Sequence, residues 1–290
     1  MGRKRQLSGM RTLVTGASQG IGRALALAAA KRGAWVLAVA RSGDLLQEVQ
    51  REAQGLPGRL ETLVADVTSA EDRQRMLQAA VAFFGGLDIL VNNAGIGATG
   101  HFSDASEERL RRIFEVNFFG PAELIRLAIP LLRQGRTPLI VNISSVAGLR
   151  AFPARSEYSA SKFALQGLSE ALRAELVRYD IDVLVVSPGL TATNFPKNML
   201  ENKARMPMDH RRSMSPEQVA EATLRAMERG RNSLVLTWEG KLVVWFNRLF
   251  PRLVDWLMAR KVYQLYRDEI EQRRQAENSP APLETVPSKQ

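Results

Sequence analysis

The stretch Thr15-Gly16-Ala17-Ser18-Gln19-Gly20-Ile21-Gly22 decides the fold of this protein. It follows a short apolar run at 12–14 and precedes an alanine- and leucine-rich segment at 21–32. This order predicts a buried strand, a glycine turn and a helix. The glycines let the backbone turn tightly and approach a pyrophosphate, while the amino end of the helix offers free N–H groups and a positive dipole end. Because of this context, we favour a phosphate-binding turn over a turn with a purely structural role.

Apolar runs and amphipathic segments alternate along most of the chain. We expect further strands at 35–40, 60–65, 88–91, 139–143, 182–186 and 233–237, and helices at 45–54, 70–84, 106–133, 157–179 and 215–229. Strands that are apolar on both faces and alternate with helices indicate a parallel sheet covered on both sides. The fold class is therefore α/β, with a single doubly wound parallel sheet of the Rossmann type over residues 8–240.

Composition limits the chemistry that is available. The 290 residues suit one large α/β domain with appendages, and they include no cysteine and only two histidines, His101 and His210. This excludes disulfides and a cysteine nucleophile, and we expect no metal site. The net charge is +10. No zinc-finger spacing or long basic run accompanies it, so we expect no nucleic-acid partner. The first ten residues lack the apolar core of a secretory signal, and we expect a cytoplasmic protein.

The end of the second strand bears on the choice of dinucleotide. A carboxylate there would bind the ribose 2′-hydroxyl of NAD, but the chain reads Val39-Ala40-Arg41-Ser42. Arg41 is placed to pair with a 2′-phosphate, and Ser42 can donate to it, which predicts NADP(H) over NAD(H). The alternative is an ordinary surface arginine. After the third strand, Asp66 either accepts from the adenine amino group or caps the helix that begins near Ser69.

Tyr158 and Lys162 are four residues apart in a predicted helix and therefore share one face. The pKa of a free tyrosine is near 10, too high for efficient proton exchange at neutral pH, and a nearby ammonium lowers it. A cationic nicotinamide ring would add to this effect. The spacing alone is a weak signal, because it arises by chance on amphipathic helices.

Several motifs stand together in one order. These are residues 15–22, Asn92-Asn93-Ala94-Gly95, Asn117, Ser145, Tyr158, Lys162 and Pro188-Gly189. In this order and spacing the chain closely resembles the short-chain dehydrogenase/reductase family over about residues 8–240. The resemblance implies an NADP(H)-dependent oxidoreductase that interconverts a carbonyl and an alcohol, and we expect it to reduce a hydrophobic ketone or aldehyde of lipid, steroid or retinoid type. An NAD-linked alcohol dehydrogenase running oxidatively and a non-catalytic dinucleotide-binding scaffold at a membrane are the alternatives.

The resemblance also implies the roles of single residues. Tyr158 is the general acid in reduction and the general base in oxidation, and Lys162 lowers its pKa and binds the nicotinamide ribose. Ser145 holds the substrate oxygen, and Asn117 completes a proton relay through water to Lys162. Ser144 competes for the serine role, but the family places this serine thirteen residues before the tyrosine, which favours Ser145.

Cofactor contacts are implied along the whole edge of the sheet. They comprise Gly16, Ser18, Gln19, Gly20 and Ile21 in the turn, then Arg41, Ser42, Asp66, Val67, Asn93, Gly95, Tyr158, Lys162, Pro188, Gly189, Thr191 and Thr193. We expect the Asn92 to Gly95 stretch to be mainly structural. One departure from the family pattern concerns Gln19, because many NADP-preferring relatives carry a basic residue there. The NADP(H) prediction therefore rests on Arg41, with Ser42 assisting.

A segment outside this edge follows the sixth expected strand. Residues 195–214 are apolar and basic, with Met206, Met208 and Met214 among them, and they suit a lid over a lipophilic substrate. Core packing is the alternative. We predict that Ser145, Tyr158, Phe195 and Met199 contact the substrate.

The C-terminal residues 241–270 form an apolar and basic extension. Charges interrupt the apolar stretch too often for a membrane span, and two amphipathic helices joined at Pro251 fit better. Residues 241–267 either contact a membrane peripherally, cap the domain, or lie at an interface between copies. We expect a homodimer or homotetramer, and a disordered polar tail over 271–290.

Overall fold

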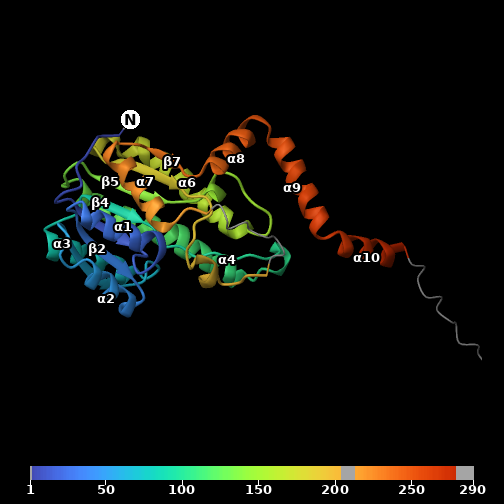
Figure 1. The fold of residues 1–290 in the computed structure, drawn as a ribbon, viewed down its shortest axis with the longest axis horizontal. Coiled ribbons are helices and arrows are strands. Elements are labelled where there is room, and N and C mark those ends of the chain that lie inside the picture. The colour runs from blue at the N-terminus through green and yellow to red at the C-terminus, as the bar shows by residue number, and fades with distance from the viewer. Residues whose placement is uncertain (1, 204–212, 279–290) are drawn as a thin grey trace, which may run out of the picture.

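The computed structural model describes residues 2–203 and 213–278. Its centre is one seven-stranded sheet in the order β3-β2-β1-β4-β5-β6-β7, and every neighbouring pair is parallel (Figure 1). The strands are β1 Arg11–Thr15, β2 Trp35–Ala40, β3 Arg59–Val64, β4 Ile89–Asn92, β5 Leu139–Ile143, β6 Asp182–Ser187 and β7 Ser233–Val235. The predicted doubly wound parallel sheet is thus confirmed, and the strand order reverses between β1 and β4.

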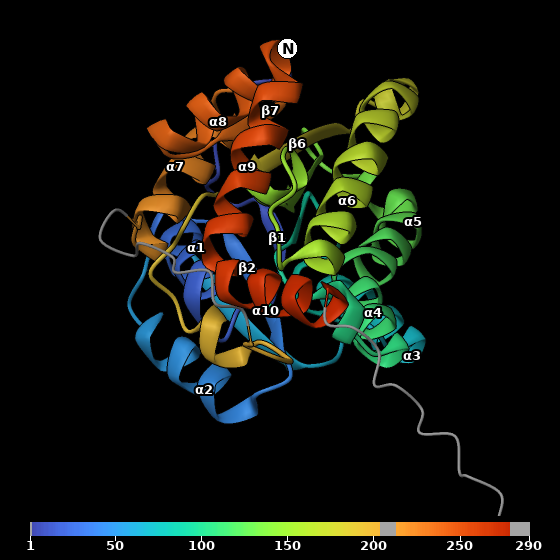
Figure 2. The same ribbon diagram turned by 90° about the vertical axis from the view of Figure 1, so that its right-hand side faces the viewer.

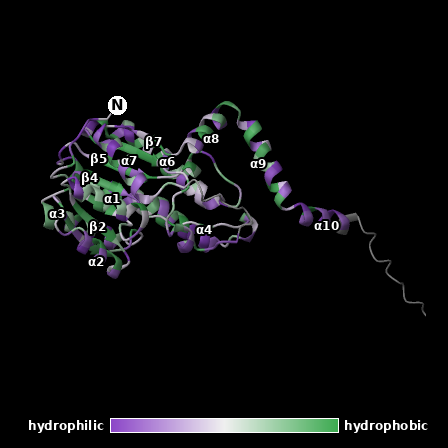
Figure 3. Ribbon diagram, viewed as in Figure 1, coloured by the Kyte–Doolittle hydropathy of each residue, from purple (hydrophilic) through white to green (hydrophobic). Residues whose placement is uncertain are grey.

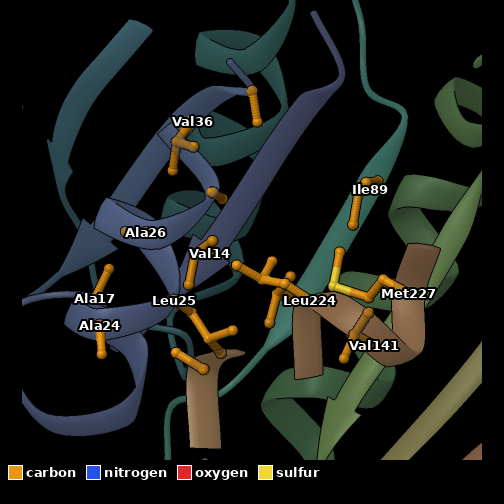
Figure 4. Packing of buried hydrophobic residues seen from close by; sticks show 14 of the residues in the cluster. Val14, Ala17, Ala24, Leu25, Ala26, Val36, Ile89, Val141, Leu224 and Met227 are labelled. Atoms are coloured by element: carbon orange, nitrogen blue, oxygen red, sulfur yellow. The ribbon is translucent and has the colours of Figure 1, made fainter. Parts of the chain in front are cut away.

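Helices cover both faces of the sheet. They are α1 Gly20–Lys31, α2 Gly43–Glu52, α3 Ala70–Phe84, α4 Glu107–Phe114, α5 Gly120–Leu132, α6 Ser156–Glu175 and α7 Pro216–Glu228. Successive strand residues enter opposite cores, as Leu13 and Val14 of β1 do. Val14 packs with Leu25 of α1 and Leu224 of α7 (Figure 4). The strands are therefore apolar on both faces because each face is buried under helices.

The predicted helix at 106–133 is not continuous. It is divided by a π-helical turn over Glu115–Phe119, which separates α4 from α5. The side chain of Asn117, inside this turn, accepts from the Ile96 amide at 2.9 Å and donates to the Ile96 carbonyl at 2.9 Å. These bonds join the helix to the loop after β4. Such π-turns are frequent at functional sites.

The C-terminal extension forms three helices, α8 Trp238–Leu249, α9 Pro251–Leu265 and α10 Arg267–Asn278. The expected break at Pro251 is present. The first helix starts three residues before 241, and α10 occupies 267–278, where the sequence suggested a disordered tail from 271; residues 279–290 lie outside the described part. In Figure 2, α9 and α10 pass in front of the sheet, and Figure 3 shows apolar and polar residues alternating along α8 and α9. No helix in the described ranges is long and apolar enough to cross a membrane.

Candidate active site

The predicted site residues gather where the carboxyl ends of β1, β4, β5 and β6 meet. β1 and β4 are neighbours in space although three helices and two strands separate them in sequence. This is the switch point of a doubly wound sheet, where such folds bind their ligands.

The glycine turn between β1 and α1 has the geometry of a phosphate cradle. Gly16 and Gly20 adopt φ values of 65° and 56°, which disfavour residues with a Cβ. A Cβ on Gly22 would lie 2.2 Å from the Gly16 carbonyl oxygen, so the turn and α1 pack too closely for any side chain there. Gln19, the N-cap residue of α1, makes no capping side-chain bond within the described structure. The amino end of α1 therefore fits the pyrophosphate of a dinucleotide.

The end of β4 is tied to this turn. The Asn93 side-chain amide donates to the carbonyls of Thr15 and Gly16, at 2.9 and 3.1 Å. The Thr15 hydroxyl accepts from the amides of Asn93 and Ala94, at 3.0 and 3.1 Å. Deeper in the sheet, Asn92 donates to another buried side chain, Asn142, at 2.9 Å. The stretch after β4 thus fixes the spacing of the two strands that flank the switch point.

Lys162 is buried beneath Tyr158 on α6. Its ammonium lies 5.9 Å from the Tyr158 ring centroid and donates to the Ile143 carbonyl at 3.0 Å. Burial lowers the pKa of Lys162 to about 8. The helical spacing therefore does bring the two side chains together, but it places the ammonium in a poorly solvated position.

Burial is also the largest influence on the pKa of Tyr158. It raises the pKa of the phenol, while a hydrogen bond with Ser145 and the positive charge of Arg155 act in the opposite direction. The net direction is therefore upward, and the lowering of the Tyr158 pKa by Lys162 stays a prediction. The physical reason is that the loss of hydration outweighs the nearby charges.

The structure separates the two candidate serines. Ser145 hydrogen-bonds Tyr158, and its hydroxyl also accepts from the Ala147 amide at 3.1 Å. Ser144 is buried, and its hydroxyl donates to the Lys162 carbonyl at 3.4 Å. Only Ser145 of this pair is thus placed to share a substrate oxygen with Tyr158.

Asn117 and Gly95 complete this group from the β4 side. Asn117 also donates to the Ser161 hydroxyl at 3.0 Å, which joins the π-turn to α6. A Cβ on Gly95 would lie 3.3 Å from the Asn117 Oδ1 and 3.5 Å from the Lys162 Nζ. The three predicted residues therefore converge on one point, although they come from three separate elements.

The edge that would meet the adenosine half of a dinucleotide is basic. Arg41 is exposed after β2, and its charge contributes to holding the pKa of Asp66 below its usual range. Asp66 accepts from the Thr68 amide and hydroxyl at 2.9 and 2.8 Å, and the Arg112 guanidinium lies 3.4 Å from its other oxygen. The helix cap is Ser69, which accepts from the Asp72 amide, so the alternative that Asp66 caps α3 is wrong. Arg112 was not found from sequence, because α4 reaches this edge only in the folded chain.

Other residues that we predicted to contact the cofactor lie in the segments after β3 and β6. Val67 is buried, and its carbonyl would lie 2.9 Å from a Cβ on Gly120. The Pro188 carbonyl accepts from the Val146 amide at 2.9 Å. Across the glycine turn, the Thr193 methyl would lie 3.3 Å from a Cβ on Gly20. Thr193 is thereby placed beside the predicted phosphate site.

The segment after β6 places an aromatic side chain, Phe195, beside Tyr158. The Phe195 ring centroid lies 5.8 Å from that of Tyr158, and its contact with the substrate stays a prediction. Met199 is partly buried. Met214 packs against the core and pairs with Thr191 in a short bridge, which supports the core-packing alternative at that position. The lid residues at 204–212, with Met206 and Met208, lie outside the described ranges.

A glycine turn at the switch point of a parallel sheet, next to a Ser-Tyr-Lys group, defines a dinucleotide-dependent oxidoreductase. Residues 11–204 match the family model for short chain dehydrogenase. The chain belongs to the short-chain dehydrogenase family, and it is an NAD(P)-dependent oxidoreductase that acts on CH–OH or C=O groups.

Three similar proteins illustrate the relationship. An uncharacterized oxidoreductase, YxnA of Bacillus subtilis, is 35% identical over 256 residues, covering 87% of this chain and 72% of the relative. A Burkholderia phymatum short-chain dehydrogenase solved with NAD superposes with a TM-score of 0.79 at 25% identity, covering 86% of this chain and 96% of that one. An alcohol dehydrogenase from Thermococcus sibiricus solved with 5-hydroxy-NADP gives 0.70 at 26% identity, covering 78% and 94%. Relatives of this fold thus hold either dinucleotide.

Proposed function

We propose that this protein is an NADP(H)-dependent reductase of hydrophobic ketones or aldehydes. The observation that carries the proposal is the placement of Tyr158 over the buried Lys162, whose ammonium lies 5.9 Å from the Tyr158 ring centroid, with Ser145 acting on the phenol. Bound NADPH supplies a hydride to the carbonyl carbon. Tyr158 gives its proton to the carbonyl oxygen, and the Ser145 hydroxyl donates to the same oxygen as charge develops on it. One hydride and one proton together convert C=O into CH–OH.

The pKa of Tyr158 favours the reductive direction. Burial raises it, so the phenol keeps its proton at neutral pH and is ready to donate. Oxidation requires the phenolate, which the protein alone disfavours; the positive charge of an oxidised nicotinamide ring would lower the cost. The raised pKa of Tyr158 therefore disfavours the oxidative NAD-linked alternative.

Replacing Tyr158 with phenylalanine tests its role as the general acid. The same experiment tests the alternative that the protein is a non-catalytic scaffold. We expect Tyr158→Phe to reduce turnover by about 10² to 10⁴, the usual contribution of a general acid, while NADPH binding is retained. The measurement is NADPH consumption over a panel of steroid ketones, retinaldehyde, 3-keto acyl thioesters and short aldehydes. Equal turnover by both proteins would refute the role of Tyr158, and no turnover by the parent on any substrate would favour the scaffold.

NADP(H) selectivity is assigned to Arg41. It is exposed at the end of β2, no carboxylate follows that strand directly, and Arg112 adds a second positive charge at the same edge. We expect Arg41→Asp to raise the KM for NADPH at least tenfold and to leave the KM for NADH unchanged or lower. Arg51→Asp, which removes an exposed arginine from the last turn of α2, is the matched control. An unchanged preference for NADPH in the Arg41 variant would refute the assignment.

We further propose that the C-terminal extension lies on an anionic membrane surface. Trp238, Leu242, Trp245 and Leu249 recur at helical spacing along α8 and are all exposed. On α9 the exposed apolar residues include Leu253, Trp256 and Leu257. From 241 to 274 the chain carries eight Lys or Arg and four Asp or Glu. Tryptophan beside arginine on an apolar face is typical of helices that lie in a bilayer interface.

The opposite side of the extension contacts the domain. Arg150, in the loop before α6, pairs with Asp255 of α9 at 2.7 Å and with Asn247 of α8 at 3.0 Å. The Tyr266 ring lies 4.8 Å from the His101 ring, edge to face. With these contacts made, the exposed apolar residues of α8 and α9 named above face away from the domain. Capping of the domain and membrane contact are therefore compatible.

Co-sedimentation with vesicles tests the membrane proposal. We expect the parent to bind vesicles that contain phosphatidylserine, with much weaker binding to neutral vesicles, and Trp245→Ser/Trp256→Ser to lose most of it. Phe83→Ser, which removes an exposed aromatic ring from α3, is the control. Equal binding by the parent and the double variant would refute the proposal.

We also propose a homo-oligomeric assembly in the cytoplasm. Phe119 and Phe163 are exposed on the neighbouring π-turn and α6, and such apolar patches mark interfaces. A second copy on the extension itself is disfavoured, because pairing two extensions would bring together two segments that each carry eight Lys or Arg and four Asp or Glu between 241 and 274. Analytical ultracentrifugation of the parent and of Phe119→Ser/Phe163→Ser tests this, and a monomeric parent would refute it.

A further inference from the structure

Arg109 of α4 joins three chain segments through one buried guanidinium. Its side chain is 4% exposed, and its Nε donates to the Glu157 carboxylate at 2.9 Å. Its Nη1 donates to Glu201 at 2.7 Å, and its Nη2 to Glu157 and, at 3.4 Å, to the His101 carbonyl. Glu157 directly precedes Tyr158, Glu201 lies after β6, and His101 lies after β4. None of these contacts belongs to the hydride-transfer chemistry described above.

The two loops that meet at Arg109 are also joined by backbone pairing. We refer to residues 97–100 and 200–203 as the loop clasp. The Leu200 amide donates to the Gly97 carbonyl, the Thr99 amide to the Glu201 carbonyl, and the Lys203 amide to the Thr99 carbonyl, each at 2.9 Å. The Thr99 hydroxyl adds a bond to the Asn202 side chain at 2.8 Å. The clasp thus closes the segment after β6 onto the loop after β4.

The loop clasp determines where the substrate wall stands. A Cβ on Gly97 would lie 3.0 Å from the Phe195 ring and 3.6 Å from the Tyr158 ring. The absence of a side chain at Gly97 therefore lets Phe195 approach Tyr158. If the clasp opened, the segment that carries Phe195 would lose the hydrogen bonds that begin at Leu200, two residues beyond η5 Phe195–Asn198.

The two carboxylates of the network differ in burial. Glu157 is 2% exposed, and removal of its cationic partner would leave an uncompensated charge in the interior. Glu201 is 28% exposed and also lies 3.5 Å from the Lys203 ammonium, so it can separate from Arg109 and be hydrated. The inner pair with Glu157 is therefore permanent, whereas the outer pair with Glu201 can open.

From these contacts we propose that Arg109 is a positioning residue, which latches the segment after β6 closed against Tyr158 through its outer pair with Glu201. The inner pair with Glu157 fixes the guanidinium one residue from Tyr158. Substrate binding then depends on the fraction of molecules in which the latch is closed, because apparent affinity falls in proportion to that fraction. This role rests on the proposed function only in that the wall next to Tyr158 faces a carbonyl substrate.

The test uses one variant that weakens only the outer pair and one that weakens both pairs. Glu201→Gln keeps the size of the side chain and the Arg109 to Glu157 pair, while Arg109→Lys keeps the charge but loses the fork that reaches both carboxylates. In both variants we expect KM for the best carbonyl of the panel to rise about tenfold, kcat to change less than twofold, and the Kd for NADPH to stay within twofold. Glu107→Gln, which removes an exposed partner of Arg111 in the first turn of the same helix, is the control.

Hydrogen exchange supplies a readout that needs no substrate. The amides of Thr99, Leu200 and Lys203 should exchange at least tenfold faster in Glu201→Gln than in the parent, with an unchanged Tm. Unchanged exchange of these amides would overturn the latch, whatever the kinetics show. A fall in Tm with an unchanged KM would likewise overturn it, because that pattern describes a merely structural ion pair. If the parent reduced no carbonyl, the proposed function would fail while the exchange experiment still decided the latch.

Discussion

Replacing Lys162 with methionine should make the protein more stable and inactive. Lys162 is buried at the bottom of the predicted site, and burial lowers its pKa from 10.5 to about 8. The folded chain therefore binds a proton there less readily than the unfolded chain does. Below about pH 8 the folded state holds an ammonium in a poorly solvated place, and this charge destabilises it. Methionine has a similar length and carries no charge.

The size of the effect follows from the shift in the Lys162 pKa. A change from 10.5 to about 8 corresponds to about 3 kcal/mol of unfolding free energy at pH 7. The variant also loses the hydrogen bond from Nζ to the Ile143 carbonyl, which costs about 1 kcal/mol. We therefore expect Lys162→Met to gain about 2 kcal/mol at pH 7. Turnover should fall by about 10² or more, because the variant would lose the ribose contact and the proton path that we propose for Lys162.

Urea unfolding at several pH values measures this gain. Protonation of Lys162 lowers stability fully below about pH 8, and this loss diminishes as the pH rises from 8 through 10.5. The advantage of the variant should thus be largest at pH 7 and nearly absent at pH 10. Lys4→Met, at an exposed position near the amino terminus, should show no such trend. A variant less stable than the parent at pH 7, or an advantage independent of pH, would show that buried Lys162 does not destabilise the folded state.

Two further predictions concern the fold around the site. Gly22→Ala should abolish NADPH binding measured by fluorescence titration, because its Cβ would lie 2.2 Å from the Gly16 carbonyl oxygen; Gly167→Ala, where the Cβ meets nothing within 4 Å, should bind normally. Asp88→Asn should lower the unfolding free energy at pH 7 by about 3 kcal/mol, because the buried carboxylate pairs with Arg11. The pKa of Asp88 is lowered, so its contribution is present above about pH 4 and is lost as the pH falls through the folded value; a difference from the parent that did not shrink as the pH fell below 4 would contradict this.

The sheet could be predicted from the sequence because its signals are local. The central strands are short apolar runs that alternate with amphipathic helices, and the confirmed parallel order follows from that alternation. The pairing of Tyr158 with Lys162 was also predictable, since helical spacing alone places them on one face. The choice between Ser144 and Ser145 came from the family resemblance, and the structure supports it through the bond to Tyr158.

Other features depend on contacts between residues far apart in sequence. The π-turn at Asn117 forms because its side chain bonds the backbone of Ile96, which a helical pattern over 106–133 does not reveal. Arg109 looks like one of several charged residues on an amphipathic helix. Its burial between Glu157 and Glu201 appears only when α4, α6 and the segment after β6 come together.

By itself the sequence determined the succession of strands and helices, the glycine turn and the residue types of the active site. These depend on periodicity, on backbone freedom and on spacing within single elements. Only the tertiary structure decided the protonation of Tyr158 and Lys162, the partners of Arg109 and the side of the extension that stays exposed. Hydration and charge pairing depend on everything that surrounds a group, and those surroundings come from distant parts of the chain.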